Sequence, residues 1–88
     1  MKKKLLVIHS RDNVGVLLQK AEAGDICTHE KKTIKILKNT EFAHKIALTD
    51  IPAEATVFKY GEEIGYALTD IKKGEWVHNH NMGCRRGK

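Results

Sequence analysis

Short apolar stretches, separated by polar residues and turn residues, follow one another along most of the chain. Lys32–Leu37 alternates polar and apolar positions and contains β-branched residues, which is typical of a strand with one face toward water. Lys4–Ile8 is a short apolar run bounded by charge, which predicts a buried strand. Further brief strands are predicted at Lys45–Leu48, Thr56–Tyr60, Ile64–Leu68 and Glu75–His78. Such strands, separated by turn signals at intervals of about 8 to 12 residues, favour a compact all-β domain.

Val14–Ala21 is a segment whose pattern also allows a helix. Asp12 or Asn13 would cap its start, and Gly24 would lie near its end. The opening Val-Gly-Val is a poor helix start, so an extended conformation of Val14–Leu18 stays open. The predicted fold class is therefore all-β with at most one short helix.

A five-residue repeat indicates internal pseudo-symmetry. Ala47–Ile51 recurs in identical form as Ala67–Ile71, and a turn and a valine follow each copy. We expect the aspartate of each copy to cap its own turn while the isoleucine anchors the corner in the core. A weaker echo occurs at Lys20–Ile26, but two clear copies are too few for a solenoid.

The chain is small enough that we interpret it as one domain. It has 88 residues, of which 41% are hydrophobic and 31% charged. A domain of this size buries only roughly 60% of the surface that its unfolded chain exposes, so a deep, walled pocket is not expected. We predict a single domain over 1–88, with a core at about 5–82 and a basic tail at 83–88, working as part of something larger.

The net charge of +5 does not by itself indicate nucleic-acid binding. Six basic residues lie at the two ends, and the body between them carries about −1. Nucleic-acid modules carry basic residues on a folded face, interleaved with aromatic residues, and that pattern is missing here. We therefore expect no nucleic-acid partner.

The composition also predicts a cytoplasmic protein with no membrane segment. The apolar runs fall far short of the roughly 20 residues of a membrane span. Leu5–Ile8 after three lysines imitates a secretory signal, but His9–Asp12 ends the apolar stretch after four residues. Cys27 and Cys84 form no paired framework and are expected to be reduced thiols.

His78 and His80 are the sharpest candidate for chemistry. If the strand that begins at Trp76 continues, both imidazoles project from one face about 6.6 Å apart, a span that one divalent metal can bridge. Asn81 adds an amide for a carboxylate or a water. The alternative is that both histidines are polar residues on the wet side of a terminal strand, because metal sites need three or four ligands.

His44 and Lys45 form the second candidate, as a general base or a carboxylate-binding pair. Neighbours on a strand face opposite sides, so only one of them can enter a given site, and both also fit ordinary surface residues. Asp12 and Asn13 are interpreted as a cap or turn that can also approach a ligand. His9 and His29 lack partners nearby in sequence, and neither cysteine has an activating base, so these are left out of the site.

Four blocks in one order resemble the SAF domain of the altronate and galactarate dehydratase family, which also occurs as the free small subunit of sulfolactate sulfo-lyase. The blocks are Asp12–Val16, Phe42–Leu48, Lys59–Gly65 and Gly74–Asn81. The resemblance covers about residues 5 to 82 and implies a β-clip fold. It further implies a lyase that removes water or sulfite from a hydroxy acid, with a divalent metal, typically Fe(II), and a large catalytic subunit as partner.

The resemblance also implies roles for individual residues. His78 and His80 would serve the metal, His44 and Lys45 catalysis, and Lys45, Asn81, Asp12 and Asn13 the substrate. Ala43 departs from the family pattern, which has glycine before the first histidine, so a turn with positive φ would be strained there. A non-catalytic carbohydrate-binding or assembly module is the alternative function, and the number of copies that assemble, a homo-oligomer included, is open.

Overall fold

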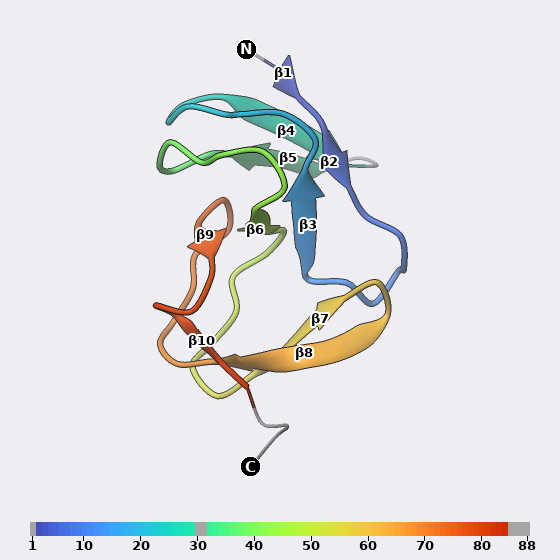
Figure 1. Cartoon of the computed structure of the whole chain (residues 1–88), viewed down its shortest axis with the longest axis vertical. Coiled ribbons are helices and arrows are strands. Elements are labelled where there is room, and N and C mark those ends of the chain that lie inside the picture. The colour runs from blue at the N-terminus through green and yellow to red at the C-terminus, as the bar shows by residue number, and fades with distance from the viewer. Residues whose placement is uncertain (1, 30–31, 85–88) are drawn as a thin grey trace.

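The computed structural model describes residues 2–29 and 32–84, which form strands and turns without a helix (Figure 1). In chain order the strands are β1 (Lys2–Lys3), β2 (Leu5–Leu6), β3 (Val14–Leu17), β4 (Ile26–His29), β5 (Lys32–Lys35), β6 (Lys45–Ala47), β7 (Thr56–Lys59), β8 (Glu62–Ala67), β9 (Trp76–Val77) and β10 (Met82–Gly83). The all-β prediction is confirmed. A helix long and apolar enough to cross a membrane does not occur among these residues.

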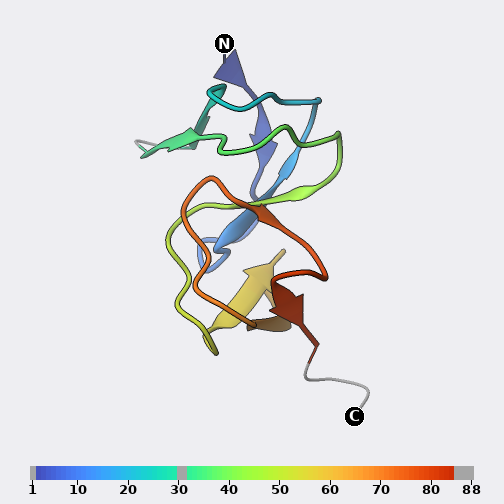
Figure 2. The ribbon, with the colours of Figure 1, turned by 90° about the vertical axis from the view of Figure 1, so that its left-hand side faces the viewer.

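The described strands form three small sheets stacked along the long axis of the molecule (Figures 1 and 2). The sheet β1-β4-β5 lies at one end, β10-β8-β7 lies at the other, and β2-β3-β6-β9 lies between them. Strands pair antiparallel except β1 with β4, which are parallel. The central sheet β2-β3-β6-β9 therefore lies between the two end sheets and links them.

Two clusters of buried apolar side chains join the central sheet to its neighbours. One connects it to the β7–β8 end and consists of Val14, Ala47, Ile51, Val57, Ala67, Ile71 and Val77. The other connects it to the β4–β5 end and consists of Leu17, Ala21, Cys27, Ile34, Ile36, Ile46 and Leu48. Small and β-branched side chains make up most of both clusters, in line with the few aromatic residues in the sequence.

Four turns of the same shape, here called the corner turns, reverse the chain at residues 21–25, 40–44, 51–55 and 71–75. The fourth residue of each has a positive φ: Gly24 (94°), Ala43 (72°), Glu54 (76°) and Gly74 (90°). The positive φ expected at Ala43 is thus confirmed. Since a β-carbon disfavours this region, Ala43 and Glu54 hold a strained backbone.

Two backbone hydrogen bonds join each corner turn to one buried residue in a strand or next to one. Gly24 N donates to Ile36 O at 2.8 Å, and Ile36 N donates to Asp25 O at 2.8 Å. The same pair of bonds joins the second corner turn to Leu17, the third to Ala67 and the fourth to Ala47. The strands are thereby held in place although each is only two to six residues long.

The sequence repeat lies across a local two-fold arrangement. Ile51 and Ile71 exchange backbone hydrogen bonds of 2.8 Å in both directions. Asp50 Oδ1 accepts from Lys73 N at 2.8 Å, and Asp70 Oδ1 accepts from Ala53 N at 2.9 Å. The expectation that each aspartate caps its own turn is therefore wrong, because each caps the turn of the other copy.

The weaker echo at Lys20–Ile26 belongs to the first corner turn. There Ala21 pairs with Thr40 as Ile51 pairs with Ile71. Asn39 Oδ1 accepts from Ala23 N at 2.8 Å, in the manner of the aspartates. Four copies of one turn, in two pairs, thus underlie the repeat.

Three predicted elements differ from the structure. The segment Val14–Ala21 begins as strand β3, not as a helix, because it pairs with β2 and β6 on its two sides. Lys4–Ile8 is not a buried strand, because Ile8 is 63% exposed and Leu6 37% exposed. The tail predicted from residue 83 begins inside β10, and residues 85–88 lie outside the described residues.

Candidate functional site

Pairing of β6 with β9 brings two histidines to one tryptophan. Ile46 lies opposite Trp76 and Lys45 opposite Val77 in this antiparallel pair. The His44 ring stacks on the Trp76 ring with centroids 5.3 Å apart and planes 8° apart. The His78 ring lies 5.3 Å from Trp76 and 5.9 Å from His44, again nearly parallel.

A third histidine completes this group, here called the imidazole cluster: His44, His78 and His80 around Trp76. The His80 ring is tilted by 40° on the indole, with centroids 4.9 Å apart. His78 and His80 are exposed, while His44 and Trp76 are half-buried. The indole Nε1 is buried and finds no acceptor among the described residues, so the flat face of Trp76, and not its N–H, is what the cluster uses.

Asn81 fixes the turn that carries His78 and His80. Its side chain is buried, accepts from His78 N at 2.9 Å and donates to Trp76 O at 2.9 Å and to Glu75 Oε2 at 3.1 Å. Strand β9 ends at Val77, and His78 O accepts from Asn81 N and Met82 N. The extended conformation predicted for His78 and His80 is therefore wrong: a tight turn presents them.

Lys45 lies on the opposite face of β6 from the imidazole cluster. Successive strand residues alternate in direction, and Lys45 pairs with Val16 and Val77, which lie on that other face. Burial lowers the pKa of Lys45, and the nearby charge of Lys59 lowers it further. The sequence argument that His44 and Lys45 enter different sites agrees with this arrangement.

Asp12 and Asn13 fasten the β2–β3 connection to the hairpin of β7 and β8. Asn13 donates to Thr56 O at 2.8 Å and accepts from Phe58 N at 2.7 Å. Asp12 accepts from Gly61 N at 2.7 Å. Burial would raise the pKa of Asp12, but backbone hydrogen bonds outweigh it and lower the pKa below its ordinary value. Substrate contact by Asp12, Asn13, Lys45 or Asn81 stays a prediction.

The described residues do not by themselves fit a divalent metal. Among residues 2–29 and 32–84, no three His, Cys, Asp or Glu side chains converge as a metal ion requires. His78 and His80 instead spread around the indole, one ring nearly parallel to it and one tilted. The metal predicted for these two histidines would need most of its ligands from another chain.

The sequence does not predict that His44 stacks on Trp76. Alternation along the strand predicted at Glu75–His78 puts Trp76 and His78 on one face, so the sequence carries a signal for this pair. The register that sets His44 opposite them depends on the pairing of β6 with β9, which the sequence does not specify.

The chain belongs to the family described as the altronate/galactarate dehydratase SAF domain, whose pattern matches residues 3–85. It is 45% identical over 74 residues to altronate dehydratase of Escherichia coli (strain K12), and 35% identical over 72 residues to galactarate dehydratase (L-threo-forming) of the same organism. It is also 33% identical over 88 residues to the (2R)-sulfolactate sulfo-lyase subunit alpha of Chromohalobacter salexigens.

The share of each relative that is covered differs sharply. The matches span 84% and 80% of this chain but only 15% of the altronate dehydratase and 13% of the galactarate dehydratase. The match to the sulfo-lyase subunit spans 91% of this chain and 94% of that subunit. This domain therefore corresponds to a small module of the dehydratases and to nearly the full length of the sulfo-lyase subunit.

Proposed function

We propose that this chain is the small subunit of a heteromeric lyase that acts on a hydroxy acid, with the reaction site completed by a large catalytic subunit. The observation that carries the proposal is the near full-length match to a sulfo-lyase subunit, which covers 94% of that relative. Cavity size supports it: the cavity lined by residues 50–52 and 70–72 measures about 210 Å³, whereas ligand pockets commonly span about 300 to 1,000 Å³. A second chain would have to supply the remaining walls.

The imidazole cluster is the proposed contribution to the reaction. Elimination from a hydroxy acid removes the proton on the carbon next to the carboxylate, forms a C=C bond and breaks the C–O or C–S bond on the following carbon. The electron pair of that bond leaves with sulfite, or with hydroxide that takes up a proton to become water. A neutral imidazole accepts such a proton, and His44 is proposed as this base, with its ring orientation fixed by Trp76. His78 and His80 would contact the substrate from the same side. Fe(II) stays a prediction whose ligands would come mainly from the large subunit.

Exposed apolar side chains beside the cluster support a docking face there. Phe42, two residues before His44, is 63% exposed. Leu68 is 46% exposed, and its N donates to Asn81 O at 2.9 Å, next to the histidine-bearing turn. Exposed aromatic and aliphatic side chains of this kind are typical of the central contacts in protein interfaces.

Co-expression with a large lyase subunit tests the role of the cluster. The complex should eliminate water or sulfite from its hydroxy acid, and the single variant His44→Ala and the double variant His78→Ala/His80→Ala should each lower kcat by about 100-fold or more while the subunits still co-purify. Asn79→Ala is the matched control, since Asn79 is exposed in the same turn between the two histidines. Unchanged activity in both histidine variants would instead favour the non-catalytic binding module.

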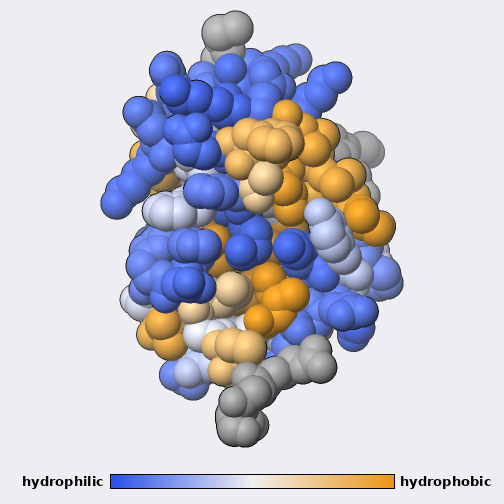
Figure 3. Space-filling model, viewed as in Figure 1, coloured by the Kyte–Doolittle hydropathy of each residue, from blue (hydrophilic) through white to orange (hydrophobic). Residues whose placement is uncertain are grey.

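A second pair of variants tests the docking face. Phe42→Ala should weaken subunit association by about tenfold or more, because truncated interface aromatics commonly cost 2 kcal/mol or more. Ile8→Ala is the comparison: Ile8 is equally exposed at 63%, and it follows β2, where apolar side chains gather on another part of the surface (Figure 3). If Ile8→Ala weakened association and Phe42→Ala did not, the proposed interface would be refuted.

A further inference from the structure

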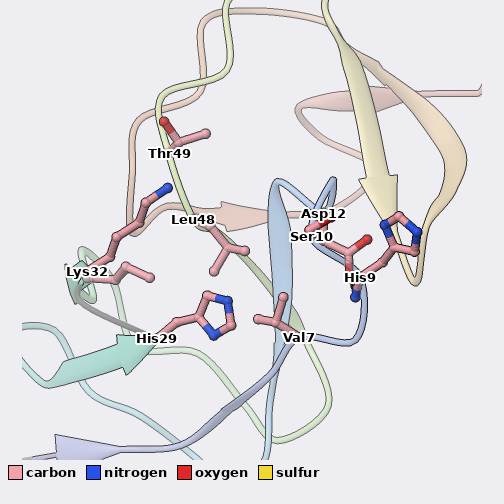
Figure 4. Close-up of a pocket in the computed structure, with 9 residues that line it drawn as sticks. Val7, His9, Ser10, Asp12, His29, Lys32, Leu48 and Thr49 are labelled. Carbon is pink, nitrogen blue, oxygen red and sulfur yellow. Dashed lines mark hydrogen bonds between the residues drawn. The ribbon is translucent and has the colours of Figure 1, made fainter.

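A cavity of about 110 Å³ lies between the β2–β3 connection, the β4–β5 hairpin and the segment after β6 (Figure 4). Its floor is apolar and consists of Val7, Ile34 and Leu48, of which Ile34 and Leu48 are buried. The residues of the imidazole cluster are not among its described lining residues. In Figure 1 the β2–β3 connection lies on the right of the molecule and β9 on the left, so this is a separate site.

The rim of the cavity is rich in hydrogen-bond donors. Lys32 and Thr49 lie on one side and Ser10 on the other, and the His29 ring lies between the two sides (Figure 4). His9 completes the lining on the side of Ser10. These side chains come from three separate segments, so no local sequence pattern indicates this cavity, and the sequence assigns no role to His9 or His29.

Asp12 is the one acid among the described lining residues, and its carboxylate is already engaged. Its Oδ2 accepts from His9 N at 3.1 Å and from Ile8 N at 3.3 Å, while its Oδ1 accepts from Gly61 N at 2.7 Å. Three backbone donors thus stabilise this carboxylate, which keeps its negative charge. Lys32 carries the one ammonium among the described lining residues, and it lies on the side of the cavity away from Asp12, where an anion would be attracted (Figure 4).

His9 is held in place before any ligand arrives. Its Nδ1 accepts from Arg11 N at 3.2 Å, so the neutral ring carries its hydrogen on Nε2 and can donate from there. A β-carbon at Gly61 would lie 2.8 Å from His9 Cδ2, so the ring rests directly on the β7–β8 turn. Since Asp12 is bonded to the same Gly61, this wall of the cavity is preorganised, which lowers the cost of binding.

We propose that this cavity binds a short hydroxycarboxylate anion of about the size of lactate. A volume of about 110 Å³ corresponds to roughly four water molecules at about 30 Å³ each, which suits a ligand of about six heavy atoms. Lys32 and the neighbouring Thr49 hydroxyl face the carboxylate, the Ser10 hydroxyl on the opposite side faces the ligand hydroxyl, and the carbon chain covers the apolar floor. The site lies outside the proposed reaction site and does not depend on it.

NMR titration of the ¹⁵N-labelled full chain with lactate, acetate and inorganic phosphate tests the proposal. Lactate should shift the amide resonances of Ser10, His29 and Thr49 saturably, with a Kd that is roughly millimolar for a ligand of this size. Acetate, which lacks the hydroxyl, should bind more weakly. Phosphate that binds more tightly than lactate would overturn the assignment of a carboxylate, because it makes no use of the apolar floor.

A matched pair of lysines on β5 provides the control. Lys32→Gln should weaken lactate binding about tenfold, the expected loss for one charge-assisted hydrogen bond. Lys35→Gln removes an equally charged, exposed lysine of the same strand that does not line the cavity, and it should leave the Kd unchanged. Equal weakening in both variants, or no saturable shifts, would refute the site. Neither result bears on the subunit role, which rests on the elimination assay.

Discussion

Gly74 is the position where one added methyl group should damage the fold most. Its φ is 90°, its N donates to Ala47 O at 2.9 Å, and its O accepts from Leu37 N at 3.2 Å. A β-carbon at this position would lie 1.9 Å from the Lys35 carbonyl oxygen. The variant Gly74→Ala must therefore push the end of β5 away from the fourth corner turn.

Gly24 offers a control with nearly the same backbone and no clash. Its φ is 94°, and an added β-carbon would meet nothing within 4 Å. Gly24→Ala should thus lower the free energy of unfolding by about 1 to 2 kcal/mol through backbone strain alone. Gly74→Ala adds overpacking and at least one lost hydrogen bond, about 2 to 4 kcal/mol more.

Urea unfolding followed by the fluorescence of Trp76 measures both variants against the parent chain at one pH and temperature. The total stability of an 88-residue domain is roughly 4 to 13 kcal/mol, so Gly74→Ala should remove a large share and Gly24→Ala a small one. If the two variants lay within about 0.5 kcal/mol of each other, the close approach of Gly74 to β5 would be refuted.

Three further predictions follow from the hydrogen bonds and backbone angles. Ala43→Gly should raise the free energy of unfolding by up to about 1 kcal/mol in urea titration, because it relieves the positive φ; a lower value would contradict the strain. Because hydrogen bonds lower the pKa of Asp12 in the folded state, its stabilisation is complete above its unfolded pKa of about 3.9 and is lost as the pH falls through the folded value. The Asp12→Asn variant should therefore lose less stability than the parent between about pH 5 and 2 in urea titrations, and parallel pH profiles would exclude this contribution. Asn81→Ala should cost about 2 to 4 kcal/mol and shift Trp76 emission to the red by opening the turn beneath it; unchanged emission would argue against that support.

The elements that the sequence predicts well are those set by local patterns. Alternation at Lys32–Leu37 corresponds to β5, and the identical segments Ala47–Ile51 and Ala67–Ile71 each lead into a corner turn of the same shape. The capping partners could not be predicted, because Asp50 and Asp70 reach across to each other's turn. That exchange depends on how the two copies meet in space.

The site was predictable in its residues but not in its shape. His44, His78 and His80 were candidates from the sequence, yet the strand was expected to continue through the two later histidines. It ends at Val77 because Asn81 captures the backbone of His78 and closes a turn, and a buried side-chain cap of this kind leaves no periodic signal. Asn81 makes its described hydrogen bonds inside the protein, and its contact with a substrate stays a prediction.

The two segments that bring the imidazole cluster together, at His44 and at Trp76, each come at the end of a corner turn. His44 directly follows Ala43, and its O accepts from Leu17 N at 3.0 Å. Trp76 follows the corner turn of Gly74, whose next residue, Glu75, is bonded to Ala47. Backbone hydrogen bonds to the central sheet therefore place His44 and Trp76, and stacking on the indole then orients the His44 ring. The strain at Ala43 lies one residue before the proposed base, where a strained backbone is most often retained to hold a functional group in place.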